Sequence, residues 1–253
     1  AAERVLRRLG ARKIKTCEVP VVFDPDMAAS LLRNLSSALS GYSLYKGASF
    51  LNGQLGNKIA SDLTTVWDDG TIPGALGSKP FDSEGLPITK KAVVENGFLR
   101  SYLLDTYSGK KLNMASTGNA SRSIGEPPGV APTNFYLASG KHAPDEIIGS
   151  VKQGLYLTET IGFGVNLVTG DYSRGAAGIW IENGELAYPV EEVTIAGNLV
   201  DMFANLTPAN DGTVLRMRSV LQRSISAVGI PEVTVISRSF SRHGSRNCII
   251  VTR

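Results

Sequence analysis

Apolar and polar positions alternate most regularly between residues 154 and 199, where glycines separate the strand-like runs. Asn183-Gly184 is a two-residue hairpin signal, because both turn positions need a positive φ that these residues tolerate. Counting outward from this turn pairs Trp180 with Ala187 and predicts an antiparallel meander with one core face. The residues predicted on that face are Ile179, Ile181, Leu186 and Tyr188.

A different spacing, of three and four residues, predicts a helix from residue 26 to residue 40. Asp24 supplies an N-cap, Pro25 suits the first helical position, and Gly41 suits a C-terminal cap. A short apolar strand over residues 18–23 precedes it. The apolar stripe expected to be buried consists of Ala28, Leu31, Leu32, Leu35, Ala38 and Leu39.

Shorter patterns complete the chain. A strand over residues 63–67 runs into a turn at Asp68-Asp69-Gly70, and a second hairpin surrounds Asn96-Gly97. Further elements are expected at 134–138 (strand), 145–151 (helix) and 199–206 (helix capped by Asn198). These patterns predict an α+β fold, mainly antiparallel β, with a curved or barrel-like sheet and the helix of residues 26–40 against one face.

Composition is that of an ordinary soluble chain, with 42% hydrophobic and 19% charged residues. No run reaches the roughly eighteen apolar residues of a membrane span, and the N-terminus lacks the apolar block of a secretory signal. The expectation is therefore no membrane partner and a cytoplasmic location. Cys17 and Cys248 are expected to be free thiols.

The net charge of +3 belongs to the C-terminal residues. Residues 212–253 contain seven arginines and a single acid, Glu232, so residues 1–211 carry 19 basic and 22 acidic residues. This abrupt change suggests a sequence that did not evolve with the fold, as a shifted reading frame would produce. A genuine basic extension is the alternative. Val233, Val235 and Ile236 could form a strand, but residues beyond about 212 are expected to be less ordered and less well packed than the meander.

Several blocks of sequence together resemble the PmbA/TldE branch of the TldD/PmbA family. They are TCEVPVVFDP, KPFDSEGLP, TGNASR followed by PTNFYL, the meander, and a last block, LTPAND, that ends at Asp211. The resemblance implies a C-terminal domain over residues 13–211, with residues 1–12 as the end of a truncated preceding domain and residues 212–253 as an atypical tail. It also implies a two-protein system, in which a TldD-like metallopeptidase subunit pairs with a TldE-like subunit that lacks the metal ligands.

The helix of residues 26–40 distinguishes these two kinds of subunit. In the TldD-like branch the resemblance implies a His-Glu-x-x-x-His motif, whose imidazoles hold a metal and whose glutamate can act as a base. Alignment through Leu31-Leu32 places Arg33, Asn34 and Ala38 at the three positions. None supplies a metal ligand or a base of that kind. The resemblance thus favours a non-catalytic subunit that needs no cofactor and works with a TldD-like partner, or as a homodimer, on unfolded or leader-bearing peptides.

Two rival functions remain open. An autonomous peptidase would need ligands or a triad, yet the chain has only His142 and His243 and no G-x-S-x-G elbow. The second rival function is weak, salt-sensitive nucleic-acid binding through the arginines of residues 212–253. The family's description as a modulator of DNA gyrase also motivates it. Aromatic residues are scarce in that segment and no recognition motif matches, so the sequence does not favour nucleic acid as a partner.

Residues 113–133 form the most function-like loop, because small hydroxyl residues, prolines and glycines suit an extended peptide laid along a sheet edge. A purely structural loop is the equal alternative. Arg174 could bind a peptide carboxylate or a partner's acid, although a pair with Asp171 or Glu159 is favoured. The candidate peptide- or partner-binding residues are Thr117, Asn119, Ser121, Arg122, Ser173 and Arg174.

Overall fold

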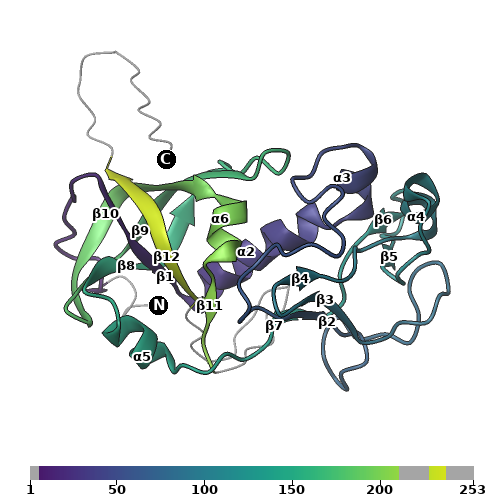
Figure 1. Ribbon diagram of the computed structural model, residues 1–253, viewed down its shortest axis with the longest axis horizontal. Coiled ribbons are helices and arrows are strands. Elements are labelled where there is room, and N and C mark those ends of the chain that lie inside the picture. The colour runs from purple at the N-terminus through teal and green to yellow at the C-terminus, as the bar shows by residue number, and fades with distance from the viewer. Residues whose placement is uncertain (1–5, 211–227, 238–253) are drawn as a thin grey trace, which may run out of the picture.

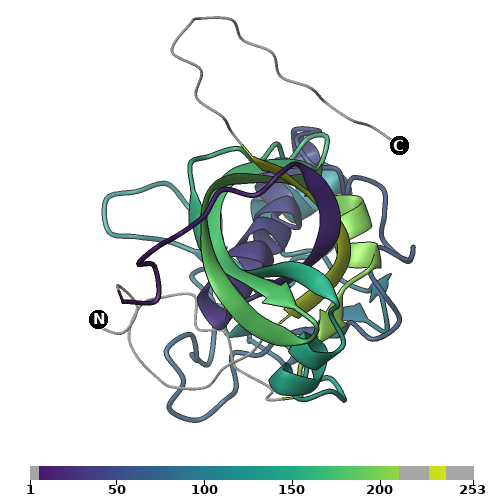
Figure 2. The ribbon, with the colours of Figure 1, turned by 90° about the vertical axis from the view of Figure 1, so that its left-hand side faces the viewer.

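The computed structural model describes residues 6–210 and 228–237, and a barrel-like sheet dominates them. The sheet order is β1-β8-β9-β10-β12-β11, and β1 also pairs with β12, so the sheet closes on itself (Figure 2). Most pairs are antiparallel, whereas β1 and β8 run parallel. The predicted α+β fold with a barrel-like sheet is confirmed. The strands are β1 (Cys17–Phe23), β8 (Gln153–Ile161), β9 (Asp171–Glu182), β10 (Glu185–Asn198), β11 (Thr207–Pro208) and β12 (Val228–Ser237).

The predicted meander is β8–β9–β10, and its central turn has the expected geometry. Asn183 and Gly184 have φ values of 51° and 82°. Ile181 lies opposite Leu186 as counted, but a bulge then shifts the register, so Trp180 lies opposite Tyr188. The predicted pairing of Trp180 with Ala187 is wrong by one residue, because a bulge adds a residue to one strand only.

This shift, together with closure of the barrel, also changes which side chains are buried. Trp180 packs into the main core, while Ile181 packs on the opposite face with Ile147 of α5 (Pro144–Gly149). Leu186, expected in the core, is 43% exposed. The single core face predicted for the meander is wrong here, because the barrel interior covers one face of β9 and α5 covers the other.

The helix α2 (Pro25–Ala38) connects the barrel to a second sheet (Figure 1). Asp24 caps it as predicted, since its Oδ1 accepts a hydrogen bond from the Met27 N–H at 3.0 Å. All six residues of the predicted stripe are buried. The helix passes into Leu39 as its C-cap rather than ending at Gly41, which instead begins the next helix.

The second sheet has the order β4-β3-β2-β7. Its hairpin turn at Asn96-Gly97 has the predicted positive φ values of 48° and 83°. Asp68, expected in a turn, is the last residue of β2. One continuous hydrophobic cluster joins this sheet, α2 and the barrel interior. The strands are β2 (Val66–Asp68), β3 (Lys91–Glu95), β4 (Phe98–Leu99) and β7 (Phe135–Leu137).

Two short helices and a small hairpin cover the end of the second sheet that is far from the barrel (Figure 1). Gly41 permits the helices to touch, because a Cβ there would lie 2.2 Å from the Ser108 Oγ. The predicted loop of residues 113–133 contains the hairpin and is therefore not irregular throughout. These elements are α3 (Gly41–Tyr45), α4 (Thr106–Leu112), β5 (Ala120–Ser121) and β6 (Gly129–Val130).

The last helix, α6 (Leu199–Ala204), is capped by Asn198 as predicted, with the Val200 N–H donating to its Oδ1 at 3.0 Å. Among the described residues, no helix combines the length and the apolar character that crossing a bilayer requires. The prediction that residues beyond about 212 pack poorly lies largely outside the described residues. The backbone of β12 falls within them and pairs antiparallel with β1, β10 and β11.

Candidate functional site

The three positions at which the metal motif was expected lie together on α2. Arg33 is exposed, and Ala38 is fully buried with its carbonyl accepting the Ser49 hydroxyl at 2.6 Å. Asn34 is half-buried, and its Nδ2 is a buried donor without a hydrogen-bond partner among the described residues. The helix thus retains its cap and packing, while these three side chains provide neither an imidazole nor a carboxylate.

A catalytic metal needs several convergent nitrogen, sulfur or carboxylate ligands. Within residues 6–210 and 228–237, no group of three His, Cys, Asp or Glu side chains is placed to share a metal ion. The His142 side chain is 58% exposed, and its Nδ1 lies 3.7 Å from the Glu146 Oε2. His243 lies outside the described residues. The donor set of the described residues therefore does not fit the metal of a metallopeptidase.

The most concentrated polar chemistry lies instead at the Asp68 carboxylate, which is completely buried. Its Oδ1 accepts hydrogen bonds from the Thr133 N–H and hydroxyl, both at 2.7 Å. Its Oδ2 accepts one from the Asn119 Nδ2 at 2.8 Å and lies 3.2 Å from the Lys91 Nζ. We call Asp68, Lys91, Asn119 and Thr133 the Asp68 network.

This network fixes the loop of residues 113–133 to the second sheet. Lys91 also donates to the Thr117 carbonyl at 2.8 Å, and the Thr117 hydroxyl accepts the Leu104 N–H at 2.7 Å and donates to the Asn119 Oδ1 at 2.8 Å. The structure therefore brings two predicted site residues, Thr117 and Asn119, together. Their side chains hold the loop in place through hydrogen bonds to other residues of the chain.

The other two candidates in this loop lie on the hairpin that the network supports. Ser121 is half-buried and pairs with Gly129, whereas Arg122 is exposed. Residues 122–129 are exposed throughout, and the Ile124 side chain at the tip is fully exposed. The Asp68 network thus anchors the base of a projecting hairpin, whose tip is available for contact with a peptide or another chain.

Ser173 and Arg174 belong to a separate region, in β9. The Arg174 Nε donates to the Gly162 carbonyl at 3.1 Å, and the Ser173 N–H donates to the Gly164 carbonyl at 2.6 Å. Glu159, a predicted partner of Arg174, instead pairs with Arg8 at 2.7 Å. Arg174 therefore braces the loop that begins at Gly162.

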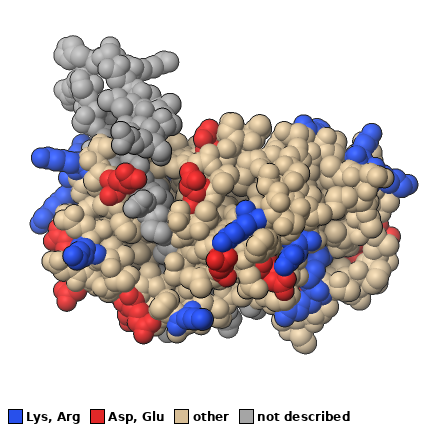
Figure 3. All heavy atoms as spheres, in the orientation of Figure 1, with Lys and Arg blue, Asp and Glu red and all other residues tan. Residues whose placement is uncertain are grey.

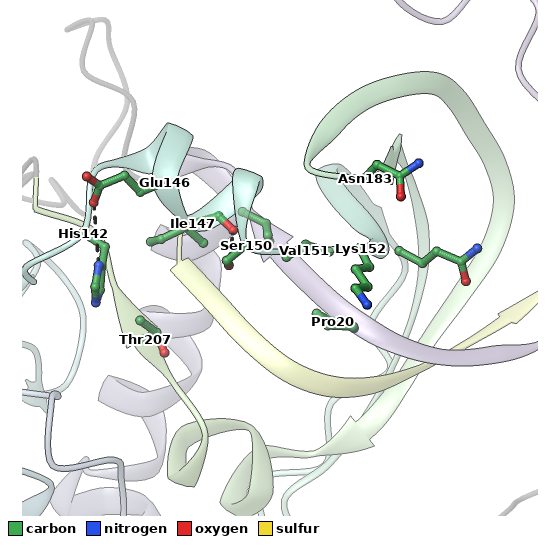
Figure 4. Close-up of a pocket in the computed structure, with 11 residues that line it drawn as sticks. Pro20, His142, Glu146, Ile147, Ser150, Val151, Lys152, Asn183 and Thr207 are labelled. Atoms are coloured by element: carbon green, nitrogen blue, oxygen red, sulfur yellow. Dashed lines mark hydrogen bonds and ion pairs between the residues drawn. The ribbon is translucent and has the colours of Figure 1, made fainter.

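A groove of about 860 Å³ lies beside α5, on the outside of the barrel (Figure 4). Its described lining includes His142, Glu146, Lys152 and Asn183, with Pro20 and Val22 from β1. The figure shows His142 turned toward Glu146, while Lys152 lies nearer Pro20. None of the sequence-predicted site residues lines this groove.

The sequence predicted Asp68 only as part of a turn and assigned no role to Lys91. The signal that could have found them is weak, because an Asp-Asp-Gly run is typical of a turn and a lysine beginning a strand is common. Their significance depends on the register of β2 and β3, in which Asp68 lies directly opposite Lys91.

Comparison with known proteins gives one family match. Residues 16–242 match the model described as the PmbA/TldA metallopeptidase C-terminal domain. The match continues past Asp211, where the last block of resemblance in the sequence ends. Haemophilus influenzae has a "Metalloprotease PmbA homolog" that is 43% identical over 210 residues, or 83% of this chain and 45% of that protein.

More distant relatives include both named branches of the family. A "Metalloprotease TldD homolog" of Buchnera aphidicola is 31% identical, over 83% of this chain and 44% of that protein. A crystal structure of a proposed modulator of DNA gyrase from Bacteroides thetaiotaomicron has a TM-score of 0.82 and 32% identity, covering 94% of this chain and 51% of that one. TldE from Thermococcus kodakarensis has a TM-score of 0.82 and 28% identity, covering 94% and 54%. The chain thus spans about half the length of the proteins it matches.

Proposed function

Because this chain belongs to the PmbA/TldD metallopeptidase family, we propose that it is a non-catalytic, TldE-like subunit that pairs with a TldD-like metallopeptidase. The family contains both PmbA and TldD homologues, which supports a division of labour between two related chains. A TldE structure is among the folds most like this one. The whole assembly would act in proteolysis or maturation of unfolded or leader-bearing peptides.

One observation carries the proposal. The helix α2 keeps its N-cap and its buried stripe, but Arg33, Asn34 and Ala38 occupy the positions expected for ligands and base. Arginine has no lone pair to donate, the asparagine amide is a poor base, and alanine has no ligand atom. A scaffold that retains its packing without the catalytic side chains suits a partner subunit.

In this role the chain would form part of the wall of a chamber shared with the catalytic subunit, and it would provide a surface on which the peptide or the partner docks. The exposed hairpin tip around Ile124 and the loop braced by Arg174 are the regions we propose for contact with the peptide or the partner. A homodimer of this chain is the alternative assembly. Both assemblies require apolar surface that is exposed in the single chain, and Ile124 and Phe163 are fully exposed examples.

The test has two parts. Co-expression with the TldD homologue from the same genome, followed by native mass measurement, should give a complex containing both chains. Two independent monomers, or homodimers of each, would contradict the pairing. Separately, this chain alone with added zinc should leave an unstructured peptide intact, whereas the co-purified pair should cleave it. Cleavage by the single chain that persists after rigorous removal of contaminating peptidases would establish an autonomous peptidase instead.

A further inference from the structure

Three tyrosines form a contiguous row across α3 and α4, with the half-buried Tyr45 between the exposed Tyr42 and Tyr107. The rings of Tyr42 and Tyr45 meet edge to face at 5.6 Å, and those of Tyr45 and Tyr107 do so at 5.7 Å. Tyr42 and Tyr107 are 56% and 57% exposed. The row depends on the close packing of the two helices that Gly41 permits. Tyrosines clustered on a surface in this way are typical of sites that bind other chains.

Two lysines lie beside the rings of this row, and a third precedes one of them in the sequence. The Lys46 Nζ lies 4.1 Å from the centre of the Tyr42 ring and donates to its hydroxyl at 2.5 Å. That hydrogen bond raises the pKa of Lys46 further above neutral pH, at which a lysine is already charged. The Lys111 Nζ lies 5.6 Å from the centre of the Tyr107 ring, and Lys110 precedes it in the last turn of α4.

These lysines are not neutralised locally. In the part of the chain that the structure describes, no carboxylate forms an ion pair with Lys46, Lys110 or Lys111. The nearby Glu84 is engaged at the other end of α4, where it accepts hydrogen bonds from the Thr106 N–H and hydroxyl at 2.9 and 2.6 Å. Figure 3 shows basic side chains exposed at the end of the molecule that carries these helices.

The geometry favours carboxylates over nucleic-acid bases as the ligand. A base needs a free aromatic face on which to stack in parallel. Here the rings meet each other at 79° and 81°, and the Lys46 ammonium lies beside the Tyr42 hydroxyl, 4.1 Å from the centre of the ring. What the surface offers instead is donors, namely ammonium N–H groups and phenolic hydroxyls, held beside apolar ring edges.

We propose that this surface binds acidic, extended peptide segments. We call it the tyrosine–lysine surface, and it consists of Tyr42, Tyr45, Lys46, Tyr107, Lys110 and Lys111. Carboxylates of the peptide contact the lysines, while its aliphatic portions lie against the ring edges. The surface adjoins the loop of residues 113–133, because α4 leads directly into that loop and α3 contacts β6. An acidic peptide held here would lie next to the exposed hairpin.

The inference rests on the proposed function for its biological role, since it names the class of peptide that the pair would receive. Binding itself can be measured on this chain alone. The full chain would be titrated into a fluorescein-labelled peptide rich in Glu, Gly and Ser, with fluorescence anisotropy as the readout. Two comparison ligands are the same peptide with every Glu changed to Gln, and an oligothymidylate of equal charge. The expected result is that the Glu peptide binds most tightly.

A pair of double variants separates this surface from general charge attraction. Lys110→Gln/Lys111→Gln should weaken binding of the Glu peptide by about threefold to tenfold, the range expected for two exposed charge contacts. Lys141→Gln/Lys152→Gln removes the same charge from exposed lysines near α5 and should change affinity less than twofold by the same estimate. Arginines of residues 212–253 are unchanged in both variants. Circular dichroism would verify folding of each.

Three outcomes would overturn the inference. They are equal weakening by the two double variants, equal binding of the Gln peptide, and tighter binding of oligothymidylate than of the Glu peptide. Failure of the proposed function looks different. The chain could bind the Glu peptide through Lys110 and Lys111 but form no complex with a TldD homologue. That result would support peptide binding by the tyrosine–lysine surface and contradict the proposed pairing.

Discussion

Asp68→Asn tests whether the loop that carries the hairpin is held by a buried charge. The substitution keeps the shape of the side chain but removes its charge and turns one oxygen into a donor. Both carboxylate oxygens already face donors, from Thr133 on one side and from Asn119 and Lys91 on the other. The asparagine therefore opposes a donor with a donor, and the Lys91 ammonium, only 14% exposed, loses its carboxylate.

The expected loss is large because the pair is buried. Removing one partner from a buried ion pair costs about 3–5 kcal/mol. For a chain of this size each kcal/mol shifts the melting temperature by roughly 2–4 °C, so the expected drop is about 6–20 °C. The loss should be greatest locally, with faster hydrogen exchange at the Thr133 N–H, whose acceptor is the altered side chain.

The control is the ion pair between Lys58 and Asp62, which is shorter, at 2.7 Å, but has side chains 50% and 74% exposed. Asp62→Asn should cost no more than about 1 kcal/mol. Urea unfolding followed by circular dichroism gives both free energies, and a matching slope in urea is required for comparison. If Asp62→Asn and Asp68→Asn destabilise the chain equally, the reasoning from burial is refuted.

Three further predictions concern local structure. Asp24→Ala should lower the unfolding free energy by about 0.5–2 kcal/mol through loss of the α2 cap, measured by urea unfolding; no change would mean that the cap is dispensable. Gly41→Ala should cost about 1–3 kcal/mol, because its Cβ would lie 2.2 Å from the Ser108 Oγ, whereas Gly149→Ala, with nothing within 4 Å, should be neutral or slightly stabilising in thermal melts. Burial raises the pKa of Tyr102, so its contribution to stability is present below about pH 10 and is lost as the pH rises through the folded-state value. Tyr102→Phe should therefore flatten the fall in melting temperature at alkaline pH, and parallel curves for the two proteins would contradict this.

Features that depend on neighbouring residues could be predicted from the sequence. The cap at Asp24 and the turn at Asn183-Gly184 need only a few adjacent residues with particular backbone preferences, and both have the predicted geometry. The buried stripe of α2 follows from helical spacing alone. The barrel-like sheet was predicted from the meander and the other strand patterns.

Features that depend on distant residues could not be predicted. The Asp68 network joins side chains 51 and 65 residues apart, through a register that no local pattern encodes. The bulge after Leu186 lies at Ala187, whose residue type does not indicate one, and Pro189 two residues later does not fix its position. Thr117 and Asn119 were predicted as candidates for binding a peptide or a partner, and their role in anchoring the loop became visible only with Asp68 in place.

Closure of the barrel also imposes an order on its biosynthesis. Among the described strands a ribosome makes β1 first and β12 last, yet β1 pairs with β12 along most of its length. Until β12 has been synthesised, β1 and β10 each expose backbone N–H and C=O groups that have no hydrogen-bond partner in the sheet. Nascent chains associate wrongly, or recruit chaperones, at unpaired strand edges of this kind. The yield of folded protein in a cell should therefore depend on chaperone supply as well as on the stability of the finished barrel.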